Sequence, residues 1–172
     1  MNEKKVLITG ITGNLGKAVA EEFIRSGYGV VGLARFISKE PLSFADNIEF
    51  HAVDLSDEAS VNDFYTQMID KGYLFDAAVF TTGGFASGSV SQTSLTDIRK
   101  QIQLNFETAF LAAKPLFLQM LDKGKGRIFF SGSNAGRDAS QGTNAVAYAL
   151  GKSLLFHLAS LLNAEAGHKD VR

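Results

Sequence analysis

The sequence predicts an α/β fold in which a doubly wound parallel sheet forms a single domain over residues 1–172. Short apolar runs alternate with segments of helical periodicity from end to end, and many of the 17 glycines stand at the junctions between them. At 172 residues with 45% apolar side chains, the chain has the size of one domain and enough apolar surface to bury a core. Because strand–helix–strand crossovers are right-handed, helices are expected on both faces of the sheet.

The expected strands are short and continuously apolar, as strands buried on both faces of a sheet are. They cover residues 6–8, 30–34, 49–53, 77–80 and 127–130. The first expected helix follows Gly16 and is ended by Gly27. Further helices are expected over 56–70, over 96–121 with a kink at Pro115, and over 145–165, whereas the Ser/Gly-rich segment 85–94 predicts a loop.

The turn after the first strand has the glycine spacing of a dinucleotide-binding site. Gly10 permits a tight turn, Gly13 lets a pyrophosphate approach the backbone, and Gly16 lets the helix pack close to the sheet. The N–H groups and the positive dipole end of the following helix then face the phosphates. A purely structural turn is the alternative, whereas a mononucleotide P-loop is excluded because Ile11 stands where that motif requires glycine.

The end of the second strand favours NADP(H) over NAD(H). An acidic residue there would hold the ribose hydroxyls of NAD, but no carboxylate lies between Glu22 and Glu40. Arg35 can instead bind a 2′-phosphate, although an exposed arginine without a ligand is the alternative. The residues expected to bind the coenzyme are Gly10, Thr12, Gly13, Asn14, Leu15, Gly16, Arg35, Asp54, Leu55, Thr82, Gly83, Tyr148 and Lys152.

Two of these groups follow the third and fourth strands. Asp54 and Leu55 stand where they can contact an adenine, and the alternative for Asp54 is simply to start a helix. Thr82 and Gly83 close the fourth strand, where small residues let the backbone pass close to the ribose of the coenzyme. All four strand ends meet at the carboxyl edge of the sheet, where such sheets bind ligands.

Four polar residues predict acid–base chemistry at the same edge. Tyr148 and Lys152 are four residues apart on one face of the last helix, and an ammonium beside a phenol favours the phenolate. Tyr148 can therefore exchange a proton with a substrate oxygen, to which Ser133 donates a hydrogen bond. Asn105 is an uncharged polar residue inside an apolar helix, which also requires an explanation.

With these motifs in this order, the chain resembles the short-chain dehydrogenase/reductase family, whose fold is Rossmann-like. The resemblance is carried by residues 9–16, Asp54–Leu55, Asn105, 128–136 and Tyr148-x-x-x-Lys152. It departs from the family at Asn14, where many members have glycine, and at 81–84, where Thr-Thr-Gly-Gly replaces Asn-Asn-Ala-Gly.

The resemblance implies an NADP(H)-dependent oxidoreductase that interconverts a small-molecule carbonyl and an alcohol by hydride transfer. It implies Ser133, Tyr148 and Lys152 as catalytic residues, and Asn105 as the holder of a water that relays protons. It also implies a homodimer or homotetramer formed through the two long helices. Two other functions fit the same fold: a non-catalytic NADP-binding regulator, and a related nicotinamide-dependent epimerase or dehydratase.

The family continues beyond the segment that corresponds to Arg172, with a sixth strand, a substrate loop and a seventh strand. We therefore expect residues 1–172 to be part of a chain of about 220–250 residues. Without the sixth strand, the fifth strand would be an unpaired edge.

Composition and charge exclude several other classes of protein. The net charge of −1 gives no reason to expect a nucleic-acid or membrane partner. No cysteine is present, and His51, His157 and His168 are scattered, so no metal site is expected. No apolar run reaches the roughly 18 residues of a membrane span, and the N-terminus has no signal-peptide core, so a cytoplasmic protein is expected.

Overall fold

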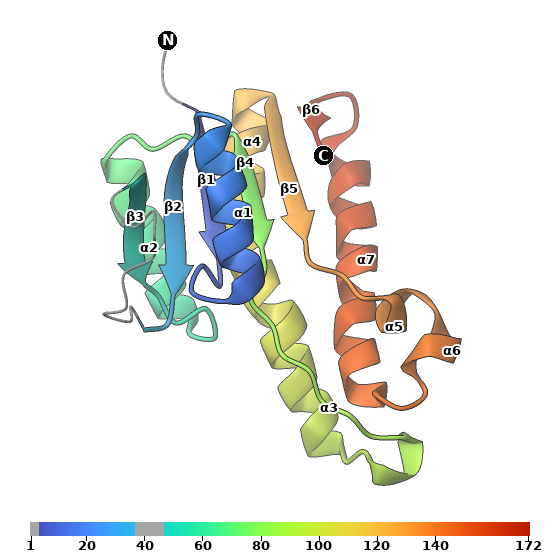
Figure 1. Ribbon diagram of the computed structural model, residues 1–172. Coiled ribbons are helices and arrows are strands. Elements are labelled where there is room, and N and C mark those ends of the chain that lie inside the picture. Colours follow the sequence, from blue (N-terminus) through green and yellow to red (C-terminus); the bar gives the residue numbers. More distant parts are fainter. Residues whose placement is uncertain (1–3, 37–46) are drawn as a thin grey trace.

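Six parallel strands form one sheet in the order β3-β2-β1-β4-β5-β6 (Figure 1). The computed structural model describes residues 4–36 and 47–172. The strands are β1 Lys5–Thr9, β2 Gly29–Ala34, β3 Ile48–Ala52, β4 Ala77–Phe80, β5 Lys125–Phe130 and β6 Asp170–Val171. The predicted α/β class with a parallel sheet is therefore confirmed.

Successive residues of a strand point to opposite faces of the sheet, so each face is apolar and is covered by helices. Val6, Ile8 and Val30 share an apolar cluster with α1 (Asn14–Arg25), which stands in front of the sheet in Figure 1. Their neighbours Leu7 and Val31 belong to a larger cluster on the other face. That cluster is completed by α2 (Glu58–Asp70), α4 (Thr108–Lys123) and α7 (Val146–Ala166).

The strand order reverses at β1, and this reversal determines where a ligand site is expected. The chain builds outward from β1 through β2 to β3, and then returns to lay β4 against the other side of β1. The crevice at the carboxyl ends of β1 and β4 is the topological switch point, where sheets of this kind bind ligands.

The long helix expected over 96–121 is divided by an irregular turn. The structure has α3 (Leu95–Ile102), a π-helical turn over Gln103–Glu107, and then α4. Pro115 lies inside α4, and the kink expected there stays a prediction. The π-helical turn was not predicted. Single π turns inside helices are frequent at functional sites, and this one contains Asn105.

The sequence led us to expect that β5 would be an unpaired edge in residues 1–172. Instead, its first residues pair with the short strand β6. β5 starts two residues earlier than predicted, and its Lys125 and Gly126 pair with Asp170 and Val171 of β6. The Ile128 N–H donates to the Arg172 carbonyl at 2.7 Å, which extends the same ladder.

Short elements surround the start of α7. The predicted loop 85–94 contains a 3-10 turn, η2 (Val90–Gln92), and two short helices, α5 (Asn134–Arg137) and α6 (Ala139–Gly142), precede α7. Gly88 of the loop forms a parallel bridge with Ala145. Among the helices of residues 4–36 and 47–172, none combines the length and apolarity that a membrane crossing requires.

Candidate active site

The turn between β1 and α1 has the conformation that its glycines predict. Gly10 has a φ of +66°, a left-handed conformation that favours glycine. A side chain on Gly16 would place its Cβ 2.3 Å from the Gly10 carbonyl oxygen, so a larger residue would force the turn open. Within residues 4–36 and 47–172, no side chain caps the N-terminus of α1 at Gly13, and the first turn of α1 has no acidic residue. The first N–H groups of α1 are therefore left for an anionic ligand.

A cavity of about 310 Å³ follows the carboxyl ends of β1 to β4. It brings together five of the residues predicted to bind the coenzyme: Gly10, Thr12, Arg35, Leu55 and Thr82. Its remaining lining comes from Leu33, Ala34, Phe36, Val53, Ser56, Leu104 and Thr108. Asn14 and Leu15 are exposed beside this cavity at the start of α1.

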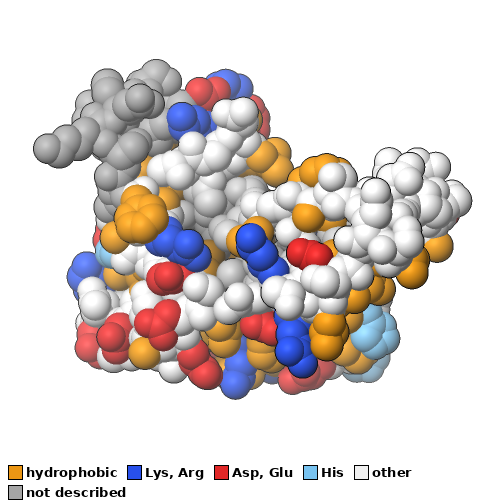
Figure 2. Space-filling view, turned by 90° about the horizontal axis from the view of Figure 1, so that it is seen from below, with side chains coloured by type: hydrophobic (Ala, Val, Ile, Leu, Met, Phe, Trp, Pro, Cys, Tyr) orange, Lys and Arg blue, Asp and Glu red, His pale blue; other side chains and the backbone are white. Residues whose placement is uncertain are grey.

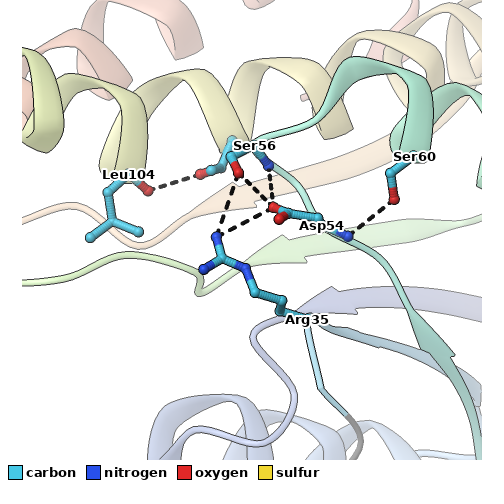
Figure 3. Close-up of polar contacts among 6 residues, drawn as sticks. Arg35, Asp54, Ser56, Ser60 and Leu104 are labelled. Atoms are coloured by element: carbon cyan, nitrogen blue, oxygen red, sulfur yellow. Dashed lines mark hydrogen bonds and ion pairs between the residues drawn. The ribbon is translucent and has the colours of Figure 1, made fainter.

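Arg35 and Asp54, predicted separately, are partners in one polar network (Figure 3). A guanidinium nitrogen of Arg35 lies 3.3 Å from Asp54 Oδ1 and 3.5 Å from Ser56 Oγ. Asp54 Oδ1 also accepts hydrogen bonds from the Ser56 hydroxyl at 2.6 Å and from the Ser56 N–H at 2.9 Å. These bonds, and then the charge of Arg35, hold the pKa of Asp54 below its usual value.

Sequence reasoning did not identify Ser56. An aspartate followed two residues later by serine forms a local side-chain-to-backbone turn, and that pattern was the available signal. Ser60 completes the arrangement, because its hydroxyl accepts a hydrogen bond from the Asp54 N–H at 3.1 Å.

Asn105 is fully buried in the π-helical turn and is held on both ends of its amide. Oδ1 accepts from the Gly84 N–H at 3.1 Å, and Nδ2 donates to the Gly84 carbonyl at 3.0 Å. Nδ2 also lies 2.9 Å from Oε1 of Gln101, a buried polar side chain that sequence reasoning did not identify. The four-residue spacing from Asn105 was the available sequence signal for Gln101. Its polar neighbours Arg99, Lys100 and Gln103 give no sign that Gln101 is buried.

Lys152 is buried beside Asn105, and Gly83 makes room for both. The Lys152 ammonium donates to the Ser131 carbonyl at 2.7 Å. A Cβ on Gly83 would stand 2.6 Å from Asn105 Oδ1 and 3.2 Å from Lys152 Nζ. Asn105 Oδ1 and Lys152 Nζ therefore both lie against the Gly83 backbone, where a side chain would not fit. Burial lowers the pKa of the Lys152 ammonium below its usual value.

Tyr148 completes this group, with its ring centroid 6.0 Å from Lys152 Nζ. The exposed ring of Phe85 packs edge-on against it at 5.1 Å between centroids. Ser133 lies at the end of β5, where its hydroxyl accepts from the Ala135 N–H at 3.3 Å and caps α5. The structure thus brings Asn105 and Lys152 together against Gly83, with the centroid of the Tyr148 ring 6.0 Å from Lys152 Nζ. Ser133 caps the short helix α5, which packs against α7.

Basic and acidic side chains are intermixed over this end of the molecule. Figure 2 looks onto the carboxyl ends of the strands and shows Lys/Arg and Asp/Glu side chains next to one another, without a broad region of one sign. Charge at this edge is therefore carried by individual residues, of which Arg35 lines the cavity.

Comparisons with known proteins agree with this geometry. A family model described as short chain dehydrogenase matches residues 4–172. An uncharacterized short-chain type dehydrogenase/reductase of Sinorhizobium fredii is 32% identical over 139 residues, which cover 79% of this chain and 54% of that protein. A short chain aldehyde dehydrogenase of Euphorbia lathyris is 26% identical, covering 98% of this chain and 60% of that protein. The chain therefore spans a little over half the length of these curated relatives.

Solved structures show the same fold. A short chain dehydrogenase from Leptospira borgpetersenii with bound NAD+ has a TM-score of 0.87 at 19% identity, covering 100% of this chain and 69% of that chain. The structure of ElxO with NADP bound has a TM-score of 0.86 at 28% identity, covering 99% of this chain and 71% of that chain.

Proposed function

Because the chain belongs to the short-chain dehydrogenase family, we propose that it forms the coenzyme-binding and catalytic part of an NADP(H)-dependent oxidoreductase that interconverts a carbonyl and an alcohol. The observation that carries the proposal is the meeting of Lys152 and Asn105 at Gly83, with the Tyr148 ring 6.0 Å from the Lys152 ammonium. A fold-stabilising role alone does not explain a buried ammonium and a buried amide at the switch point of the sheet.

The residues present fit a dinucleotide. Gly10 and Gly16 keep the first turn narrow, and the uncapped start of α1 suits a pyrophosphate. The 310 Å³ cavity suits the adenosine, with Arg35 beside it for a 2′-phosphate. The NADP-bound structure of ElxO, a protein 28% identical to this chain, supports this assignment. A bound nicotinamide supplies or accepts the hydride.

Tyr148 is the proton donor and acceptor of the proposal. Its phenol gives a proton to the substrate oxygen in reduction and removes it in oxidation. The Lys152 ammonium, fixed by the Ser131 carbonyl, favours the phenolate and restores the proton. Asn105 would hold a water through which the Lys152 ammonium exchanges its proton with solvent. Ser133 donates a hydrogen bond to the substrate oxygen.

The proposal is tested by Tyr148→Phe in the natural full-length protein, assayed against a panel of aldehydes and ketones with NADPH. We expect turnover to fall at least about 100-fold, because the acid–base group is lost. NADPH binding, measured by calorimetry, should be largely kept, because Tyr148 is only one of the residues expected to contact the coenzyme. Tyr28→Phe is the matched control, because Tyr28 packs on Phe23 beside α1 at the opposite end of the sheet. Unchanged turnover by Tyr148→Phe would refute the role of Tyr148, and NADPH binding without turnover of any carbonyl would favour a non-catalytic regulator.

The coenzyme preference has its own test. Arg35→Ala should weaken NADPH binding by about tenfold or more and leave NADH binding nearly unchanged, because only NADPH carries the 2′-phosphate. Equal affinities of the unmodified protein for the two coenzymes would overturn the preference for NADP(H) and leave the catalytic proposal standing.

We also propose that the protein associates with itself through α4 and α7. These helices expose large apolar side chains, namely Phe110, Leu118, Phe156 and Leu161. Sedimentation analysis of the full-length protein should then give a dimer or tetramer.

A further inference from the structure

We propose that Asp54 competes with the 2′-phosphate of the coenzyme for Arg35, and so limits how strongly the protein prefers NADP(H) over NAD(H). The inference rests on the proposed function, in that it takes Arg35 as the residue that meets the 2′-phosphate. It assigns Asp54 a specificity-determining role and Ser56 a positioning role.

The geometry shows that Arg35 is already engaged. Its guanidinium lies 3.3 Å from Asp54 Oδ1 and 3.5 Å from Ser56 Oγ, at the rim of the 310 Å³ cavity (Figure 3). The side chains of Arg35 and Asp54 are 54% and 40% exposed, so a ligand in the cavity can reach the pair. A 2′-phosphate therefore meets a nearly neutral ion pair rather than a free cation.

Asp54 is held more firmly than Arg35. The same oxygen, Oδ1, accepts two hydrogen bonds from Ser56, at 2.6 Å from Oγ and at 2.9 Å from the N–H. The Asp54 N–H is in turn bonded to Ser60 Oγ at 3.1 Å. Binding of a 2′-phosphate must therefore draw the longer Arg35 side chain away from a carboxylate that stays in place.

Two electrostatic effects then weaken binding of the 2′-phosphate. The Arg35–Asp54 contact is lost or shared, and the fixed carboxylate repels a phosphate that carries a charge of about −1.5 to −2. Because exposed ion pairs are weak, we expect removal of the Asp54 charge to favour the 2′-phosphate by about threefold to tenfold, rather than by orders of magnitude.

The experiment compares two nucleotides that differ only in the 2′-phosphate. The affinities of adenosine 5′-monophosphate and adenosine 2′,5′-bisphosphate are measured by calorimetry on the full-length protein, and the measured quantity is their ratio. Asp54→Asn removes the charge but keeps an oxygen for the Ser56 hydrogen bonds. Contacts of residue 54 with the adenine affect both nucleotides and cancel in the ratio. Asp54→Ser is a second uncharged variant, used if Asp54→Asn unfolds.

Two controls separate competition for Arg35 from a general change of charge. Glu58→Gln removes an exposed charge of the same sign from the first turn of α2, and no ion pair of the described residues joins Glu58 to Arg35. Arg35→Ala, alone and combined with Asp54→Asn, completes a double-mutant cycle.

We expect the preference for the bisphosphate to rise about threefold to tenfold in Asp54→Asn and to stay constant in Glu58→Gln. In the Arg35→Ala background, Asp54→Asn should not change this preference. An unchanged or reduced ratio in Asp54→Asn would overturn the inference, as would an equal rise in Glu58→Gln or in the Arg35→Ala background. Absence of a bisphosphate preference in the unmodified protein contradicts the proposed NADP(H) preference, and the change produced by Asp54→Asn still decides the inference. If neither nucleotide binds, the proposed coenzyme function fails and the inference fails with it.

Discussion

Replacing Gly83 by alanine should damage the site at its centre, whereas the same change at Gly84 should be tolerated. The two glycines are adjacent, and neither has a positive φ, so alanine fits the backbone at both. At Gly83 the new Cβ would stand 2.6 Å from Asn105 Oδ1, and at Gly84 it would stand 2.6 Å from Leu104 Cδ2. The two alanine variants therefore introduce a steric conflict of the same size, but against different neighbouring side chains.

The expected magnitudes follow from what each neighbour can do. Asn105 is fully buried and bonded to both Gly84 and Gln101, so it moves only by breaking hydrogen bonds. Overpacking of this kind costs about 1–3 kcal/mol. Leu104 Cδ2 is the end of a flexible side chain, and the lower entropy of the unfolded chain offsets its displacement by about 0.4–1 kcal/mol. We expect Gly83→Ala to be less stable than Gly84→Ala by about 2 kcal/mol.

Urea unfolding of the two variants checks this difference, and about 2 kcal/mol should separate their midpoints by about 1 M. Turnover should fall only in Gly83→Ala, because displacement of Asn105 or Lys152 by as little as about 1 Å is enough to lower a rate about 100-fold. Equal stability of the two variants, or a larger loss in Gly84→Ala, would show that the packing around Gly83 has been misjudged.

Two further predictions concern buried polar contacts. Gln101→Leu should lower the free energy of unfolding by about 0.5–1.5 kcal/mol, because Asn105 Nδ2 loses one acceptor and keeps the Gly84 and Gln101 carbonyls. Gln103→Leu, at an exposed position of the next turn, is the matched control, and equal losses would contradict the role of Gln101. Burial opposes ionisation of Asp76, but hydrogen bonds from Lys123 at 2.6 Å and from the Lys5 N–H lower its pKa overall, so Lys123→Met should cost about 1–3 kcal/mol at pH 7. A lowered carboxyl pKa contributes its full stabilisation above the unfolded value of about 3.9 and loses it as the pH falls through the lower folded value. The difference should therefore shrink as urea unfolding is repeated at falling pH below about 4, and a gap that stays constant would contradict the assignment.

Strands with a continuous apolar sequence could be predicted, and those that depend on distant partners could not. β4 was placed at its observed residues because 77–80 is apolar throughout and is bounded by polar residues and glycine. The start of β5 was missed because Lys125 and Gly126 have no strand character of their own. They extend the strand only by pairing with residues 170 and 171, and local sequence carries no sign of that contact.

The irregular turn in the long helix was not predicted, for a related reason. A proline inside a predicted helix is visible in the sequence, so a kink was expected at Pro115. The π-helical turn instead accompanies Asn105, whose amide bonds to the backbone of Gly84 after β4. Apolar periodicity cannot show such a contact, because its partner lies on another element.

The candidate residues were predictable as individuals, but their connections were not. Tyr148 and Lys152 are linked by helical spacing, and structure and sequence agree on it. Arg35 and Asp54 meet only because β2 and β3 are neighbours in the sheet, so the sequence suggested two separate ligand contacts where the structure has an ion pair. The assigned catalytic and coenzyme roles stay predictions for the experiments above.

The bridge between Gly88 and Ala145 makes the loop and the start of α7 one mechanical unit. The Gly88 N–H donates to the Asn144 carbonyl at 2.8 Å, and the Gly88 carbonyl accepts from the Val146 N–H at 3.0 Å, two residues before Tyr148. Phe85, in the same loop, rests against the Tyr148 ring. An engineer who grafts segment 85–94 from a relative to change substrate range should therefore transplant residues 144–146 with it, as a single cassette.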